Sequence, residues 1–242
     1  MEGNKKMRKM KLFKFYTILF VAVFMLAACK KETNNDEMNI NNDLFNWIKV
    51  TTDIPVYLPT KWAPIKANGS NQNYYIEAIG GKDNYTINVY QTNEPVKFND
   101  KEDLLEKNGP ISESEFMGYI SGGNEDNTNV SLDIPKDSKS FELIKGIKAY
   151  EKDDGLSIWW SQHDWNIVYD GSSNLCALQN FATVLSNTDI TVADTGNIII
   201  VGGNKLTFTY EWEKDGQKYS FVTQDTDIEN TIEILNSFIK IK

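Results

Sequence analysis

The chain has 242 residues and a formal net charge of −9, and its basic residues are concentrated at one end. Residues 1–28 hold six of the 25 Lys and Arg residues and one of the 34 acidic residues, so the remainder carries −14. Such an acidic body excludes nucleic acid as a partner, because nucleic-acid affinity depends on neutralising phosphates. Hydrophobic residues at 40% and aromatic residues at 12% predict a packed core.

The N-terminal region combines a basic leader, residues 1–16, with an apolar run, residues 17–28. The run is shorter than the roughly 20 residues that a membrane-spanning helix needs. A charged leader before a short apolar run is typical of a secretory signal peptide. The alternative is a retained transmembrane helix.

The last three residues of this run and the cysteine after it resemble a bacterial lipobox, the site where signal peptidase II cuts before a lipid-modified cysteine: Leu26, Ala27, Ala28 and Cys29. The resemblance implies that residues 1–28 are a lipoprotein signal peptide and that Cys29 carries acyl chains such as palmitate. Two acyl chains hold a protein stably on a membrane where one does not. We therefore expect membrane lipid as the partner of Cys29 and an extracytoplasmic, lipid-anchored location at the cell membrane. The alternative is an ordinary signal peptide followed by a chance cysteine.

The remainder divides by composition into a tether and two parts. Residues 29–46 are polar and Asn-rich, which predicts a lipidated flexible tether. From Trp47 onward the sequence favours strands. We predict an N-terminal α+β subdomain over residues 47–135 and a C-terminal α+β subdomain over residues 136–242.

In the first part, the two prolines of 54–59 predict an extended or edge segment. Segments 74–79 and 85–90 predict a β-hairpin. Residues 101–107 predict a short helix that stops at Asn-Gly-Pro. The Gly- and Asn-rich stretch 121–129 predicts a loop.

The second part contains two Asp-Gly dipeptides, each of which predicts a hairpin turn between the strands beside it. Apolar spacing adds two helices. The predicted strands are 146–150, 156–160, 165–169, 198–201, 206–212 and 219–222, and the predicted helices are 174–185 and 227–239, the last capped by Thr226 or Asp227.

An internal similarity links two of these segments. The hairpin from Trp160 to Trp165 and the helix after it resemble the hairpin from Trp212 to Tyr219 and its helix, with apolar helix positions 53 residues apart. Residues 74–107 repeat the order hairpin then helix more loosely. We predict an α+β fold with an antiparallel sheet, built from two or three repeated strand–turn–strand–helix units with helices on one face.

Part of the chain also resembles a domain of unknown function on extracytoplasmic Gram-positive proteins. The resemblance rests on Val56-Tyr57-Leu58-Pro59, on the hairpin from Trp212 to Tyr219, and on Ile234-Leu235-Asn236-Ser237. It covers mainly residues 205–239. Some members of that family sit behind anti-sigma-factor segments. The resemblance implies an extracytoplasmic body and brings no catalytic residues with it.

The supply of reactive side chains is small. Lipidation of Cys29 leaves Cys176 as one free cysteine, which excludes an intramolecular disulfide, and His163 is the one histidine. A Cys- and His-based zinc site is therefore not expected. Cys176 falls beside core positions of a predicted helix, which favours a buried apolar role. The alternative is a catalytic pair of Cys176 and His163. The acidic stretch 124–129 lacks the order of an EF-hand and is interpreted as a solvated loop. We predict no catalytic residue, metal site or cofactor.

Tryptophans stand out in the second part, where Trp159, Trp160 and Trp165 lie close together. Neighbours in a strand face opposite sides, so Trp159 points away from the core if Trp160 points into it. Trp159 and Trp165 are therefore candidate contacts for a glycan or another cell-envelope protein. The alternative is that Trp159 packs under a loop or a neighbouring subdomain.

These observations favour a lipoprotein whose body is a non-enzymatic interaction or sensor module. One alternative is an enzyme acting on cell-wall glycan through paired carboxylates, for which the candidates are Glu151, Asp153, Asp154, Glu211 and Glu213. A third possibility, a substrate-binding lipoprotein of a transporter, is disfavoured because the sequence lacks alternating strand–helix order.

Overall fold

The computed structural model describes residues 41–65, 72–112, 115–123, 132–152, 156–171, 175–202, 206–225 and 228–242. These residues all belong to one compact unit, Asn39–Lys242. The predicted signal peptide, the lipobox with Cys29 and most of the predicted tether lie outside the described residues. None of the described helices has the length and apolar content needed to cross a bilayer.

The described helices are α2 (Asn42–Thr51), the short 3-10 helix η2 (Ala63–Ile65), α3 (Lys101–Asn108), α4 (Leu175–Asn187) and α5 (Ile228–Leu235). The described strands are β1 (Tyr57–Pro59), β2 (Asn73–Gly80), β3 (Asn84–Thr92), β4 (Phe116–Gly123), β5 (Lys139–Ile144), β6 (Ile147–Lys152), β7 (Ser157–Gln162), β8 (Trp165–Asp170), β9 (Gly196–Val201), β10 (Leu206–Lys214), β11 (Gln217–Asp225) and β12 (Phe238–Lys240).

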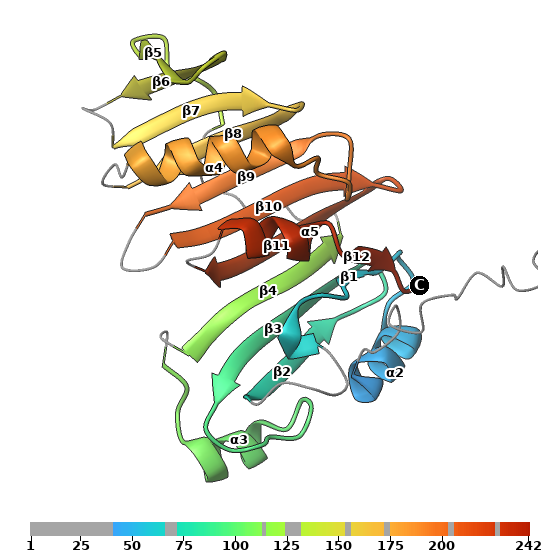
Figure 1. The fold of residues 1–242 in the computed structure, drawn as a ribbon. Coiled ribbons are helices and arrows are strands. Elements are labelled where there is room, and N and C mark those ends of the chain that lie inside the picture. Colours follow the sequence, from blue (N-terminus) through green and yellow to red (C-terminus); the bar gives the residue numbers. More distant parts are fainter. Residues whose placement is uncertain are drawn as a thin grey trace, which may run out of the picture. The chain divides into compact units, whose positions relative to one another are not determined.

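Ten of these strands form one sheet in the order β2-β3-β4-β11-β10-β9-β8-β7-β6-β5 (Figure 1). Strands β1 and β12 pair separately as a two-stranded sheet. Neighbours in the large sheet are antiparallel except β8 and β9, which are parallel. Helix α4 connects that pair, as a parallel connection requires. The predicted α+β class with a mainly antiparallel sheet is confirmed, whereas the parallel pair was not predicted.

Two tight turns set the register of the central hairpins. Asp215 and Gly216 have φ values of 52° and 72°, and they join β10 to β11 as the Asp-Gly dipeptide predicted. His163 and Asp164, with φ values of 52° and 62°, join β7 to β8 in the same way. Positive φ at both central residues suits the right-handed twist of a hairpin. The His163-Asp164 turn adopts these positive φ values without a glycine.

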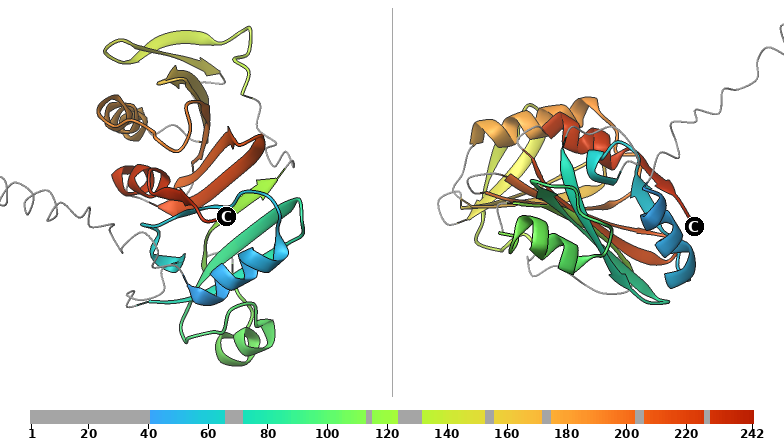
Figure 2. Two further views of the ribbon diagram at one scale, coloured as in Figure 1. Left: turned by 90° about the vertical axis from the view of Figure 1, so that its right-hand side faces the viewer. Right: turned by 90° about the horizontal axis from the view of Figure 1, so that it is seen from below.

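One face of the sheet, here called the covered face, holds most of the core. Helices α4 and α5 lie on it (Figure 2), and β1, β12 and α2 contribute buried side chains to the same cluster. Aromatic rings follow one another across this face. The ring centroids of Phe181 and Phe208 are 5.8 Å apart, and those of Tyr210 and Phe221 are 6.0 Å apart. Burial of these large rings stabilises the fold.

Asp215 fastens the two-stranded sheet to the central hairpin. Its carboxylate accepts hydrogen bonds from Lys240 Nζ at 2.7 Å and from the Tyr57 hydroxyl at 2.8 Å. The bond from Lys240, followed by the bond from Tyr57, lowers the pKa of Asp215. Burial, followed by the hydrogen bond to Asp215, raises the pKa of Tyr57 to about 12. Strands β1 and β12 are thus tied to the β10–β11 turn.

The predicted tether, residues 29–46, is wrong at its C-terminal end because α2 begins at Asn42. Asn41 caps this helix by accepting hydrogen bonds from the backbone of Asp43 and Leu44. Leu44 and Ile48 are fully buried in the core. Packing on the covered face therefore turns a polar, Asn-rich segment into a helix.

Two further boundaries differ from the prediction. Residues 121–123 continue strand β4 instead of beginning the predicted loop. The last helix ends at Leu235 instead of 239, since Phe238 starts β12 and packs 5.2 Å from Trp212. The predicted cap residues Thr226 and Asp227 lie outside the described residues.

The boundary predicted near residue 135 does not separate two sheets. Strand β4, from the predicted N-terminal subdomain, pairs along its length with β11 from the predicted C-terminal subdomain. A hairpin precedes a helix at β2–β3, at β7–β8 and at β10–β11. The predicted repetition is nevertheless not confirmed: α4 leads to the parallel strand β9, whereas α5 leads to β12 in the separate sheet.

Candidate functional site

The opposite side of the sheet, here called the open face, presents a continuous row of polar side chains. Of the described helices, only α3 lies on this side, at the β2 end (Figure 2). Residues directly opposite one another on seven adjacent strands form the row, here called the polar row: Thr86, Ser121, Ser220, Glu211, Asn197, Asn166 and Ser161.

Alternation along each strand produces this row. In β10, Tyr210 and Trp212 are buried in the core, and Glu211 between them points to the open face. In β11, Tyr219 and Phe221 enclose Ser220 in the same way. The pairing register then places these polar positions in line across the sheet.

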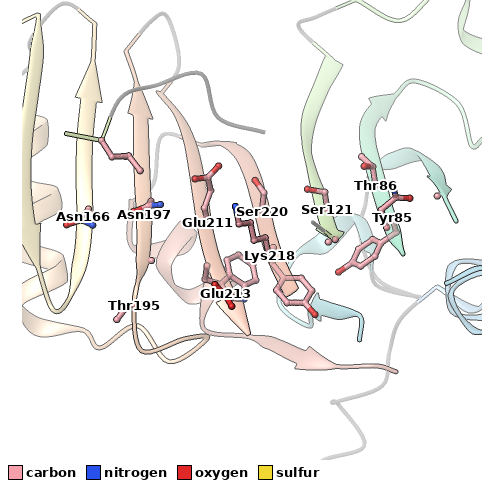
Figure 3. Close-up of a pocket in the computed structure, with 18 of the residues that line it drawn as sticks. Tyr85, Thr86, Ser121, Asn166, Thr195, Asn197, Glu211, Glu213, Lys218 and Ser220 are labelled. Atoms are coloured by element: carbon pink, nitrogen blue, oxygen red, sulfur yellow. The ribbon is translucent and has the colours of Figure 1, made fainter. Parts of the chain in front are cut away.

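A cleft of about 710 Å³ lies along the row (Figure 3). Every member of the polar row except Ser161 lines it. The other lining residues are Ile79, Gly80, Asn84, Tyr85, Gly122, Gly123, Leu132, Asp164, Thr195, Gly196, Trp212, Glu213, Lys218 and Tyr219. A volume in this range suits a small-molecule or oligomeric ligand.

The floor of the cleft is formed by two serines on neighbouring strands. Ser121 and Ser220 lie directly opposite each other and are 6% and 5% exposed. The Ser220 hydroxyl has no hydrogen-bond partner within the part of the chain that the structure describes. A buried hydroxyl without a partner is costly, and a ligand in the cleft that reached it would remove the cost.

Charged side chains border the row on one side. Glu213 and Lys218 are directly opposite each other at the end of the β10–β11 hairpin, and both are exposed. Asp164 lines the cleft from the β7–β8 turn. With Glu211 the cleft holds three carboxylates and one ammonium group, so its net charge is −2.

The candidate carboxylates for glycan hydrolysis are only partly brought together. Glu211 and Glu213 share one strand, one face and the cleft. Glu151 is on β6, four strands away, and Asp153 and Asp154 lie outside the described residues. A glycosidase places its two carboxylates on either side of the scissile bond. Of the five candidate carboxylates, only Glu211 and Glu213 are placed together within the described residues.

Trp159 points to the open face as predicted, but it is only 8% exposed. It forms a small cluster with Val168 and Ile199, against which Leu132 and Tyr150 pack. Leu132 lies where the chain passes from β4, inside the sheet, to β5 at its edge. The alternative, packing under a loop, therefore describes Trp159 better than a free contact surface.

Trp165 is not a surface contact. It points to the covered face and is 1% exposed. A side chain at Gly196 would meet its ring at 2.6 Å. The prediction of Trp165 as a contact residue is therefore wrong, because its strand position places it in the core.

Cys176 and His163 are separated by the fold. His163 lies in the turn before β8, and Cys176 follows that strand in the first turn of α4. Cys176 is exposed, so the prediction of a buried apolar role is wrong. Within the described ranges, no group of three His, Cys, Asp or Glu side chains is gathered in a way that could hold a metal ion.

Sequence reasoning missed the polar row, apart from Glu211. Its residues are common types scattered over six hairpin strands and β4, and only the pairing of distant strands aligns them. The alternation of polar and apolar residues in 206–212 and 217–222 is the local signal that could have indicated the open face.

Comparison with known proteins finds no protein-family model, curated protein or solved structure that matches this chain. The resemblance to an extracytoplasmic domain family over residues 205–239 gains no support from it.

Proposed function

We propose that this chain is a membrane-anchored extracytoplasmic lipoprotein, attached through Cys29, whose body is a non-enzymatic binding module. The ligand surface is the cleft on the open face. The observation that carries the proposal is that polar side chains from six adjacent strands line one cleft of about 710 Å³.

The composition of the cleft supports binding more than catalysis. Its central side chains are hydroxyls, amides and one carboxylate, which orient a ligand through hydrogen bonds. Nucleophilic catalysis needs a base within hydrogen-bond reach of the nucleophile, and the Ser220 hydroxyl has no such neighbour among the described residues. The polar cleft thus fits recognition without turnover.

The anchor can be tested by metabolic labelling with an alkyne analogue of palmitate in a bacterial host. We expect label and membrane fractionation for the wild-type chain and for Cys176→Ser, which removes the exposed thiol of α4. We expect no label for Cys29→Ser. Equal labelling of Cys29→Ser and wild type would contradict the anchor.

The binding role can be tested by incubating the purified full chain with soluble cell-wall fragments. We expect retention of fragments on the immobilised protein and an unchanged size distribution of the fragments. If the wild-type chain released shorter products and Glu211→Gln did not, the binding module would be contradicted. The glycan-acting enzyme would then be the better hypothesis.

A further inference from the structure

We infer that the ligand of the cleft is a neutral oligosaccharide, lying across the strands along the polar row. The inference rests on the proposed function and names its ligand class. It follows from the hydrogen-bonding chemistry of the row, from the charge of the cleft, and from the orientation of the row relative to the strands.

The row matches a ligand with many hydroxyl groups. Serine and threonine hydroxyls each donate one hydrogen bond and accept others, asparagine amides do both, and a carboxylate accepts only. Sugar hydroxyls also donate and accept. Among the six members that line the cleft, three are hydroxyls, two are amides and one is the carboxylate of Glu211. The unpartnered hydroxyl of Ser220, 5% exposed, lies in the middle of this array.

The charge of the cleft decides against an anionic polymer. Asp164, Glu211 and Glu213 face one ammonium group, that of Lys218, and the protein after residue 28 carries −14. Phosphate-rich polymers would meet repulsion here at both short and long range. A neutral chain avoids this repulsion.

The orientation of the row favours a glycan over a peptide. Extended peptides usually add to the edge of a sheet through main-chain hydrogen bonds. In the cleft the main chains of β11, β10 and β9 are already paired on both sides, so side chains alone are offered. At the β2 edge, Asn99 already bonds to the main chain of Ala78.

The row also sets a length. Six adjacent strands carry the members of the polar row that line the cleft, and a strand spacing of about 4.8 Å makes this part of the row about 24 Å long. A ligand that follows the row gains contacts with each added sugar until the cleft is filled. Ile79 and Leu132 supply apolar contacts among the lining residues.

The experiment measures binding of β-1,4-linked N-acetylglucosamine dimers, tetramers and hexamers to the full lipidated chain by titration calorimetry. The chain is held in a zwitterionic detergent, because a sugar-based detergent would compete. We expect affinity to rise from dimer to hexamer. The double variant Asn197→Ala and Asn166→Ala should weaken hexamer binding about tenfold or more, and Glu211→Gln by a smaller factor.

Matched controls lie on the same face outside the cleft. Asn88 on β3 and Glu77 on β2 bond to each other at 3.3 Å and line no part of the cleft. Asn88→Ala and Glu77→Gln should bind the hexamer as the wild type does. Thermal unfolding of each variant shows whether a variant with weaker binding is still folded.

Three results would overturn the inference: no binding of the hexamer to the wild-type chain, equal affinity for dimer and hexamer, or equal loss in the cleft variants and the controls. Binding of a Ser- and Asn-rich peptide in place of the hexamer would also overturn it, and would leave the binding module standing. Shortening of a bound hexamer would instead contradict the non-enzymatic role and leave the ligand class standing.

Discussion

The two faces of the large sheet are made by the same strands and differ in almost every chemical respect. Strand β10 presents Phe208, Tyr210 and Trp212 to the covered face, where they are at most 4% exposed. To the open face it presents Thr209, Glu211 and Glu213. Because side chains alternate, one strand can serve folding on one side and recognition on the other. Substitutions on the two faces should therefore separate stability from binding.

The largest effect on stability is expected at Phe208, which is fully buried. Its ring centroid lies 5.8 Å from that of Phe181 and 6.3 Å from that of Tyr210. Phe208→Ala should lower the free energy of unfolding by about 3–5 kcal/mol, because it removes a ring and leaves a cavity. Thr209→Ala, one residue further on the open face, should change it by less than about 1 kcal/mol. Urea denaturation of both variants measures the contrast, and similar losses would contradict it.

The next effect is expected at Gly122 in β4, which lies opposite Tyr85 and Tyr219. A β-carbon there would meet Tyr85 Cε1 at 2.5 Å and Tyr219 Cδ1 at 3.0 Å. Gly122→Ala should therefore destabilise the protein by about 1–3 kcal/mol. Gly81→Ala is the control, since its nearest neighbour would be 3.9 Å away. Equal melting temperatures for the two variants would show that the ring contacts are loose.

A smaller, pH-dependent effect is expected at Asp215. Its pKa is lowered in the folded protein by Lys240 and then Tyr57. Its contribution to stability is therefore complete above the unfolded-state pKa of about 3.9 and is lost as the pH falls through the lower folded-state pKa. Asp215→Asn keeps a residue that tolerates the φ of 52° and removes the charge.

Denaturation between about pH 6 and pH 2 should accordingly show a steeper acid loss of stability in the wild-type chain than in Asp215→Asn. Parallel profiles for the two proteins would show that the bonds from Lys240 and Tyr57 do not anchor the two-stranded sheet.

The smallest effect on stability is expected in the polar row itself. Asn197 is half-buried on β9 and projects into the cleft. Asn197→Ala should shift the free energy of unfolding by no more than about 0.5 kcal/mol, although it weakens ligand binding. A calorimetric melting curve checks this, and a loss as large as that of Gly122→Ala would assign the row to folding.

Local signals in the sequence predicted the elements that local chemistry decides. The Asp215-Gly216 dipeptide marked its hairpin, and apolar spacing marked α4 and α5, although it extended the second helix to residue 239. Strand β4 was not predicted. One reason is that Gly122 and Gly123, taken without their neighbours in space, indicate a loop. The glycines of β4 are needed because rings and backbone from distant strands approach them, and because Gly118 and Gly123 have φ values of 147° and 135°.

The candidate site was harder to predict for the same reason. Ser121 and Ser220 are almost a hundred residues apart, and neither residue type is distinctive by itself. Trp159 was the most visible candidate, and its predicted direction was right. What covers it, Leu132, comes from a connection whose path depends on the order of the strands, which no local pattern contains.

The central claim, that the open face is the ligand surface, is tested most directly by NMR of the side-chain amide groups in the full chain. On titration with the N-acetylglucosamine hexamer, the account predicts shifts of the Asn166 and Asn197 amide signals and unchanged signals from Asn88, on the same face outside the cleft. Unchanged signals from Asn166 and Asn197 together with shifts in α4 or α5, on the covered face, would contradict it.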